Sequence, residues 1–237
     1  MLLEQRAFDI ARRIARRRSA PALHPSGLNC AGVLDVPGSD NGRWGGGWLD
    51  RPGLYDVAVR WSRAAGLPGG LPDGLGLALR VADAGGPGAP LDLLLTSSGA
   101  GRLGRHLPLP RRDAIGGPYS TLVSYRAGDR ERVLAAFPVR HGPRRVPGGL
   151  PALREALGRA PVSFDLRAAA PGEPWRSFAT LTVRAPGDAP PTSSPGYDPY
   201  AHSVPGLRPT ARLRDLRIAA YSGSRHGRAD RAGARHG

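Results

Sequence analysis

Apolar and polar residues alternate along several short stretches of this chain, and segments rich in glycine and proline separate these stretches. In LYDVAVRWS (54–62), every second residue from Tyr55 to Trp61 is large and apolar. A period of two is the pattern of a β-strand with one buried face. On this basis we predict strands at 29–36, 54–62, 75–83, 91–97, 119–125, 161–168 and 176–184.

Helical spacing of apolar residues is found at both ends of the chain and in two short segments between strands. In LLEQRAFDIARRIARRR (2–18), apolar residues recur every three to four positions, which predicts a basic amphipathic helix. This helix could pack on its own domain or on a partner subunit, or lie on a membrane surface. Further helices are predicted at 129–137, at 150–158 and from Thr210 to His226.

The composition favours strands joined by turns over a helical bundle. Glycine contributes 34 and proline 25 of the 237 residues, about a quarter of the chain. We therefore expect an α+β protein, mainly antiparallel β, folded as a barrel or sandwich with helical additions. The single cysteine, Cys30, excludes an internal disulfide framework and a Cys-rich zinc site.

A formal net charge of +15 raises nucleic acid and anionic membranes as partners. All 34 basic residues are arginine and most are dispersed, which indicates a compositional bias rather than one basic surface. We therefore expect no nucleic-acid partner. No stretch approaches the ~20 apolar residues of a membrane-spanning helix. The N-terminus also lacks the apolar core of a secretory signal, so we expect a cytoplasmic protein.

A tyrosine stands among arginines near the C-terminus, in LRIAAYSGSRHGR (216–228). Steps of four, four and three would place four residues on one helix face: Arg217, Tyr221, Arg225 and Arg228. A guanidinium beside a phenol favours the ionised phenol, and tyrosine oxygen is one axial ligand of haem iron. The farther arginines, Arg225 and Arg228, could then pair with the carboxylates on the porphyrin edge. The alternative is an exposed arginine-rich helix with Tyr221 packed on the barrel.

Two more polar groups precede this stripe. His24 lies in the loop LHPSG (23–27), and Ser62 shares a predicted strand face with Arg60 in VRWS (59–62). Taken with the C-terminal stripe, their order along the chain resembles that of the haem catalase family.

The resemblance to haem catalases is colinear. LHPSGLNCAGVLDV resembles the segment with the family's distal histidine and first barrel strand. VRWSRAAGLPGGLPDGLGLALRV is similar to its arginine–aromatic–serine motif with the following turn and strand, and PLDLLLTSS is similar to its Asp-Leu segment. YDPYAHSVPGLRPTARLRDLRIAAYSGSRHGR resembles the C-terminal haem segment with its Arg-x-x-x-Tyr motif. The matching segments cover 23–97 and 197–228, a little under half of the chain.

The resemblance implies haem b as the cofactor and a role for each matched residue. His24 falls at the distal acid–base position, and Ser62 falls at the hydroxyl that orients the histidine ring. Tyr221 falls at the axial iron ligand, and Arg217 at the residue that keeps the phenol oxygen anionic. The propionate-binding positions are Arg60 and Arg228.

Departures from the family pattern change the implied chemistry. Thr96 stands in place of the catalytic asparagine that positions peroxide, and Pro21 stands in place of a third propionate arginine. Ala219 replaces a phenylalanine, and 223–224 replaces an Asp-Thr pair. Thr96 is smaller than asparagine and leaves more room for a substrate. The resemblance therefore implies peroxide-dependent oxidation or rearrangement of a small organic substrate, rather than fast catalase activity.

Two other functional classes remain open. One is a degenerate catalase-like barrel without haem that serves as a binding or interaction protein. The other is a nucleic-acid or membrane-surface protein that uses the basic residues at both ends of the chain. Cys30 is a rival thiolate ligand, although its place in a predicted strand favours a core residue.

The resemblance also divides the chain into five parts. Assembly into a homo-oligomer is left open. The expected parts are an N-terminal helical arm (1–22), a catalase-like barrel with short helical insertions (23–184), a wrapping loop (185–208), a C-terminal haem-ligand helix (209–228) and a disordered tail (229–237).

Overall fold

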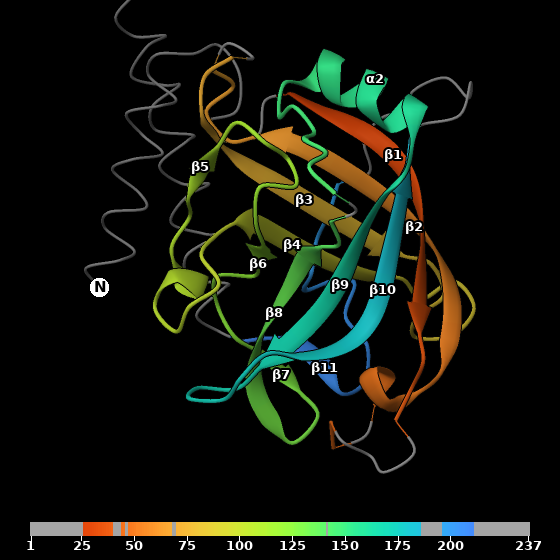
Figure 1. Ribbon diagram of the computed structural model, residues 1–237. Coiled ribbons are helices and arrows are strands. Elements are labelled where there is room, and N and C mark those ends of the chain that lie inside the picture. Colours follow the sequence, from red (N-terminus) through yellow and green to blue (C-terminus); the bar gives the residue numbers. More distant parts are fainter. Residues whose placement is uncertain are drawn as a thin grey trace, which may run out of the picture.

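Antiparallel strands close into a ring in the computed structural model, which describes residues 26–39, 44–45, 47–67, 70–140, 142–185 and 196–210 (Figure 1). Around the ring the order is β1-β2-β3-β4-β6-β8-β9-β10, and the ring closes because β10 pairs with β1. The eight strands are β1 (Ser26–Val36), β2 (Gly53–Arg63), β3 (Asp73–Val81), β4 (Leu91–Ser97), β6 (Tyr119–Ser120), β8 (Arg130–Pro138), β9 (Val162–Ala169) and β10 (Arg176–Arg184).

Several short elements lie outside this ring of strands. The helix α2 (Leu150–Arg159) buries Leu153 and Leu157 and packs against β1 and β10. The strand β5 pairs with β3, and β7 and β11 extend the sheet beyond β8. The remaining elements are β5 (Pro110–Arg111), β7 (Tyr125–Ala127), β11 (Leu207–Pro209) and the 3-10 turns η1 (Trp48–Asp50) and η2 (Gly104–His106).

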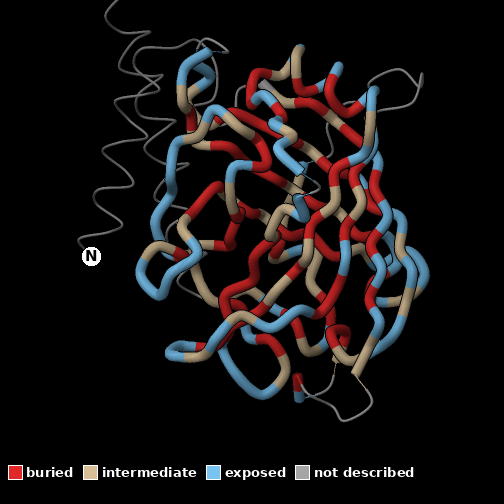
Figure 2. The backbone as a smooth tube through the Cα atoms, in the orientation of Figure 1, coloured by how far each residue is buried: buried red, intermediate tan, exposed pale blue. Residues whose placement is uncertain are grey.

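Buried residues alternate with more exposed ones along several barrel strands (Figure 2). The buried side chains fill the interior of the barrel. The rings of Trp61, Tyr119 and Phe164 pack there with centroids 5.7–6.1 Å apart. The indole N–H of Trp61 donates to the hydroxyl of Tyr119 over 3.1 Å, and that hydroxyl donates to the carbonyl of Ala114 over 2.7 Å. The interior is thus filled by a mainly apolar core, and the polar side chains of the matched motifs lie on the outer face.

Most of the secondary-structure predictions are confirmed. Strands are present where they were predicted at 29–36, 54–62, 75–83, 91–97, 161–168 and 176–184, although β3 ends at Val81, and the helix at 150–158 is present as α2. The stretch 119–125 forms parts of two short strands rather than one. Leu122, between them, has a φ of 58°, which interrupts the extended backbone.

The helix predicted at 129–137 is wrong, because this segment is the strand β8. Its centre, Leu134 to Ala136, favours helix by local propensity. In the fold it pairs with β6 on one side and with β9 on the other, which closes the ring. Residues 132–136 are buried in succession, so the alternation that marks a strand is absent from the sequence.

The helices predicted at 2–18 and from Thr210 to His226 lie outside the described residues, apart from Thr210 itself. The same holds for the wrapping-loop residues 186–195. Among the residues that the structure describes, no helix is long and apolar enough to span a membrane.

Candidate functional site

The outer face of β1 to β4 carries Arg60, Ser62 and Thr96. Residues paired across antiparallel strands point to the same side of the sheet. Two neighbouring rows, which we call the outer-face site, cross the four strands here: Gly27–Ser62–Gly76–Thr96 and Asn29–Arg60–Ala78–Leu94. As the strand alternation predicts, Arg60 and Ser62 share a face, and small residues on β3 separate them from β4.

Arg60 is a half-buried cation in this site. Among the described residues, no hydrogen bond or ion pair engages its guanidinium. The guanidinium lies over β1, because a Cβ at Gly27 would stand 2.7 Å from Cζ of Arg60. That Cβ would also stand 2.9 Å from the carbonyl oxygen of Trp61, so a larger residue at 27 would clash with the backbone. A partly desolvated guanidinium without a counter-charge is suited to bind a carboxylate.

Ser62 and Thr96 belong to one row but lie two strands apart, roughly 10 Å by the usual strand spacing. Ser62 is buried, and it pairs in register with Gly27, three residues beyond His24. Thr96 is half-buried and adjoins Ser120 of β6. The two hydroxyls therefore flank the site from opposite sides and do not act as one pair.

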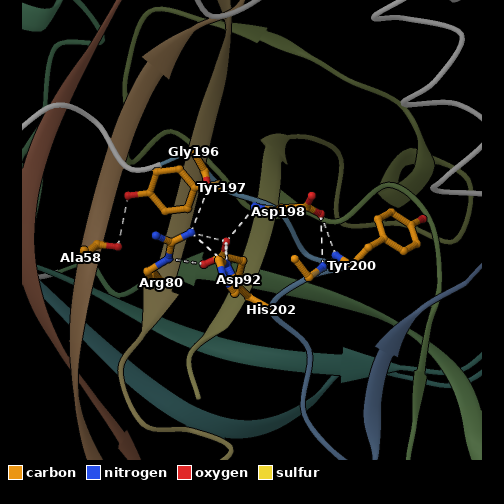
Figure 3. Close-up of polar contacts among 9 residues, drawn as sticks. Ala58, Arg80, Asp92, Gly196, Tyr197, Asp198, Tyr200 and His202 are labelled. Carbon is orange, nitrogen blue, oxygen red and sulfur yellow. Dashed lines mark hydrogen bonds and ion pairs between the residues drawn. The ribbon is translucent and has the colours of Figure 1, made fainter. Parts of the chain in front are cut away.

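A saturated polar cluster lies beside the outer-face site and binds the segment 196–204 to the barrel (Figure 3). The carboxylate of Asp92, on β4, is fully buried and accepts two hydrogen bonds from Arg80, at 2.8 and 2.7 Å. It also accepts from the backbone N–H of Asp198 at 2.7 Å, and Nδ1 of His202 lies 2.9 Å away. Arg80 donates further to the carbonyl of Gly196 at 2.9 Å.

The electrostatics of this cluster favour its charged form. Burial alone would raise the pKa of Asp92, but hydrogen bonds from Arg80, His202 and the Asp198 N–H hold that pKa below its usual range. The hydrogen bond to Asp92 raises the pKa of Arg80. The Arg80 guanidinium also lies over the ring of Tyr197, 5.3 Å from its centroid. Burial raises the pKa of Tyr197 to about 12, so this phenol stays neutral.

Cys30 belongs to the barrel core and not to the outer-face site. It alternates with Asn29 along β1, so the two side chains point to opposite faces. Burial raises the pKa of its thiol to about 12, and the thiolate form needed for metal ligation is therefore disfavoured. The expectation of a core residue is confirmed.

Several predicted site residues lie outside the described residues: His24, Arg217, Tyr221 and Arg228. Their roles remain predictions from the sequence. Within the described part of the chain, no three His, Cys, Asp or Glu side chains are grouped as metal ligands.

The sequence reasoning missed three residues of this region. Asn29 lies beside Arg60 on the outer face, and Arg80 and His202 complete the cluster around Asp92. One signal was present, since a single aspartate in the apolar strand LDLLLTS (91–97) calls for a buried partner. Arg80 lies on the neighbouring strand, 12 residues earlier, but His202 lies 110 residues further on and has no local signature.

Comparison with known proteins supports the fold and no more. No protein-family model matches the sequence, and no relative is found among curated proteins. Among solved structures, a fungal catalase aligns with a TM-score of 0.61 and 12% identity, over 90% of this chain and 60% of the catalase. A bacterial catalase aligns with a TM-score of 0.60 and 13% identity, over 87% of this chain and 56% of that protein. The chain thus has a catalase-like fold and spans somewhat over half the length of these catalases.

Proposed function

We propose that this catalase-like barrel is a haem-dependent oxidoreductase that uses a peroxide to oxidise or rearrange a small organic substrate. The observation that carries the proposal is Arg60, an outer-face cation without a partner among the described residues. A haem carries two carboxylates that need such partners, and the residues beside Arg60 on β3 are the small Gly76 and Ala78. The residues present therefore fit the group.

Each residue would have a distinct task. Arg60 and Arg228 would bind the haem carboxylates, and Tyr221 would ligate the iron while Arg217 keeps the phenol oxygen ionised. The bound haem would supply an iron at which the peroxide O–O bond is broken.

The proton transfer belongs to the chain itself. His24 would take a proton from one peroxide oxygen and return it to the other, a general acid–base role suited to a pKa near neutrality. Ser62 would fix the orientation of the imidazole by a hydrogen bond. Thr96 would leave space for an organic substrate where a longer amide would hold peroxide alone. We therefore expect peroxidase-type turnover to exceed disproportionation.

The first experiment is an absorption spectrum of the protein produced with added haem precursor. We expect a Soret band in the wild type that shifts or collapses in Tyr221→Phe. Tyr200→Phe is the control, because the hydroxyl of Tyr200 donates to the backbone carbonyl of Thr210, and it should leave the band unchanged. Protein that stays colourless after haem addition would overturn the proposal and favour a haem-free binding barrel.

A second variant tests the acid–base step. In His24→Ala, haem should still bind, but the rate of reaction with peroxide should fall by about a hundredfold or more. Stopped-flow absorbance at the Soret band measures that rate. Full peroxide reactivity in this variant would remove His24 from the mechanism.

A further inference from the structure

Among the described residues, the amide oxygen of Asn29 and the guanidinium of Arg60 have no hydrogen-bond partner, and the two residues are neighbours across β1 and β2. Asn29 stands opposite Arg60 in the register of β1 and β2, with their Cα atoms about 5 Å apart. The amide oxygen of Asn29 is buried and has no hydrogen-bond partner among the described residues. Buried polar atoms nearly always have a partner, so this orphaned amide indicates that a ligand completes the site.

The guanidinium and the amide do not satisfy each other. Arg60 extends over Gly27, the outward-facing residue two positions before Asn29 on the same strand. The two groups therefore flank one patch of the β1 surface, and both lack a partner there. An asparagine amide can turn by half a rotation about its last torsion, so that its NH2 faces a ligand.

We infer that Asn29 is a second carboxylate-binding residue, which acts with Arg60 to hold one carboxylate on the outer face of the barrel. The guanidinium supplies charge and two parallel donors, and the amide supplies a third donor. The carboxylate could belong to the edge of haem, in which case the inference rests on the proposed function, or to a free organic acid. In either case Asn29 would offset the loss of the arginine that Pro21 replaces.

The experiment titrates the full-length chain with haem and with haem dimethyl ester, which has the same ring and iron but no free carboxylates. In Asn29→Leu, haem affinity should fall about tenfold, as for loss of one hydrogen bond to a charged group, while affinity for the ester is unchanged. Thr180→Leu, at an exposed outer-face position on β10, is the control and should change neither affinity. Equal affinities of wild type and Asn29→Leu for haem, or an equal loss for both ligands, would overturn the inference.

A second variant separates binding from folding. In Asn29→Asp, the new carboxylate should pair with Arg60, so that thermal stability holds or rises while the preference for haem over the ester disappears. A variant that is stable and retains the wild-type preference would contradict the inference.

Failure of the wild type to bind haem would overturn the proposed function. The inference about Asn29 would then be tested by a separate experiment with a free acid. Propionate and its uncharged analogue propionamide would then be compared by thermal shift at matched concentrations. Stabilisation by propionate that is lost in both Arg60→Met and Asn29→Leu would support a site for a free acid. Equal effects of the two compounds on the wild type would overturn it.

Discussion

Arg60 and Arg80 project from the same outer face of neighbouring strands, one register step apart, yet their surroundings differ completely. Arg80 donates hydrogen bonds to a buried carboxylate and to a backbone carbonyl, and its guanidinium lies over an aromatic ring. Arg60 has no hydrogen-bond or ion-pair partner in the described part of the chain. The two arginines therefore differ in role: Arg80 binds segment 196–204 to the barrel, whereas Arg60 is the residue that we propose binds a ligand.

The largest effect should come from removing the carboxylate on the Arg80 side. In Asp92→Asn, a fully buried anion with three donors is lost, and the free energy of unfolding should fall by about 3 kcal/mol. Urea denaturation followed by circular dichroism measures this change. Glu155→Gln removes an exposed pair with Arg159 and should cost less than about 1 kcal/mol. An equal loss of unfolding free energy in the two variants would contradict the structural role assigned to Arg80.

The same pair makes stability depend on pH. Because the pKa of Asp92 is lowered in the folded chain, its stabilisation is present above the unfolded pKa of about 4 and is lost as pH falls through the folded value. The difference in unfolding free energy between wild type and Asp92→Asn should therefore shrink from about pH 6 to about pH 3. A series of urea titrations across this range checks the sign. A difference that grows toward low pH would contradict the ionised pair.

A smaller effect distinguishes two adjacent hydroxyls of β4. Ser97 faces inward, where it accepts from the N–H of Leu75 at 3.0 Å and donates to the carbonyl of Leu109 at 2.7 Å. Ser97→Ala should cost about 1–2 kcal/mol. Thr96 faces outward, and no hydrogen bond engages its hydroxyl among the described residues. Thr96→Val should lower the free energy of unfolding by less than about 0.5 kcal/mol, as measured by thermal denaturation. A cost equal to that of Ser97→Ala would show that the Thr96 hydroxyl stabilises the fold, as the Ser97 hydroxyl does.

The smallest expected change is at Arg60 itself. Arg60→Met keeps the length of the side chain and removes a charge that has no hydrogen-bond or ion-pair partner among the described residues, so the unfolding free energy should change by less than about 0.5 kcal/mol. Arg80→Met, the matched variant, should lose about 3 kcal/mol. Urea denaturation of both proteins makes the comparison direct. A large loss in Arg60→Met would mean that Arg60 stabilises the fold and is not free for a ligand.

The alternation of apolar residues was enough to predict most of the barrel strands and the shared face of Arg60 and Ser62. It failed at β8, where burial on both faces erased the alternation and Leu134 to Ala136 favoured a helix locally. In such a segment, pairing with two neighbouring strands decides the structure, and no local pattern reports that pairing.

The candidate site was predictable only in part, for a similar reason. Colinear motifs pointed to Arg60, Ser62 and Thr96, and the register brings these residues to one face. The role inferred for Asn29 depends on Arg60 lying over Gly27. The hydrogen bonds of Arg80 depend in part on a segment more than a hundred residues away in the sequence. Such relations arise only when distant strands and loops meet.

The closure of the ring by β1 and β10 has a consequence for how the chain acquires its structure. Ala31 pairs with Arg184 and Asp35 with Thr180, so the strand pair that closes the ring joins residues about 150 positions apart in the sequence. Pairings between such distant segments must overcome a large loop-closure entropy, and proteins dominated by them fold slowly. During synthesis, β1 cannot complete its hydrogen bonding until β10 has emerged from the ribosome. Until then one edge of the sheet stays open to pairing with other chains, which exposes the growing polypeptide to aggregation.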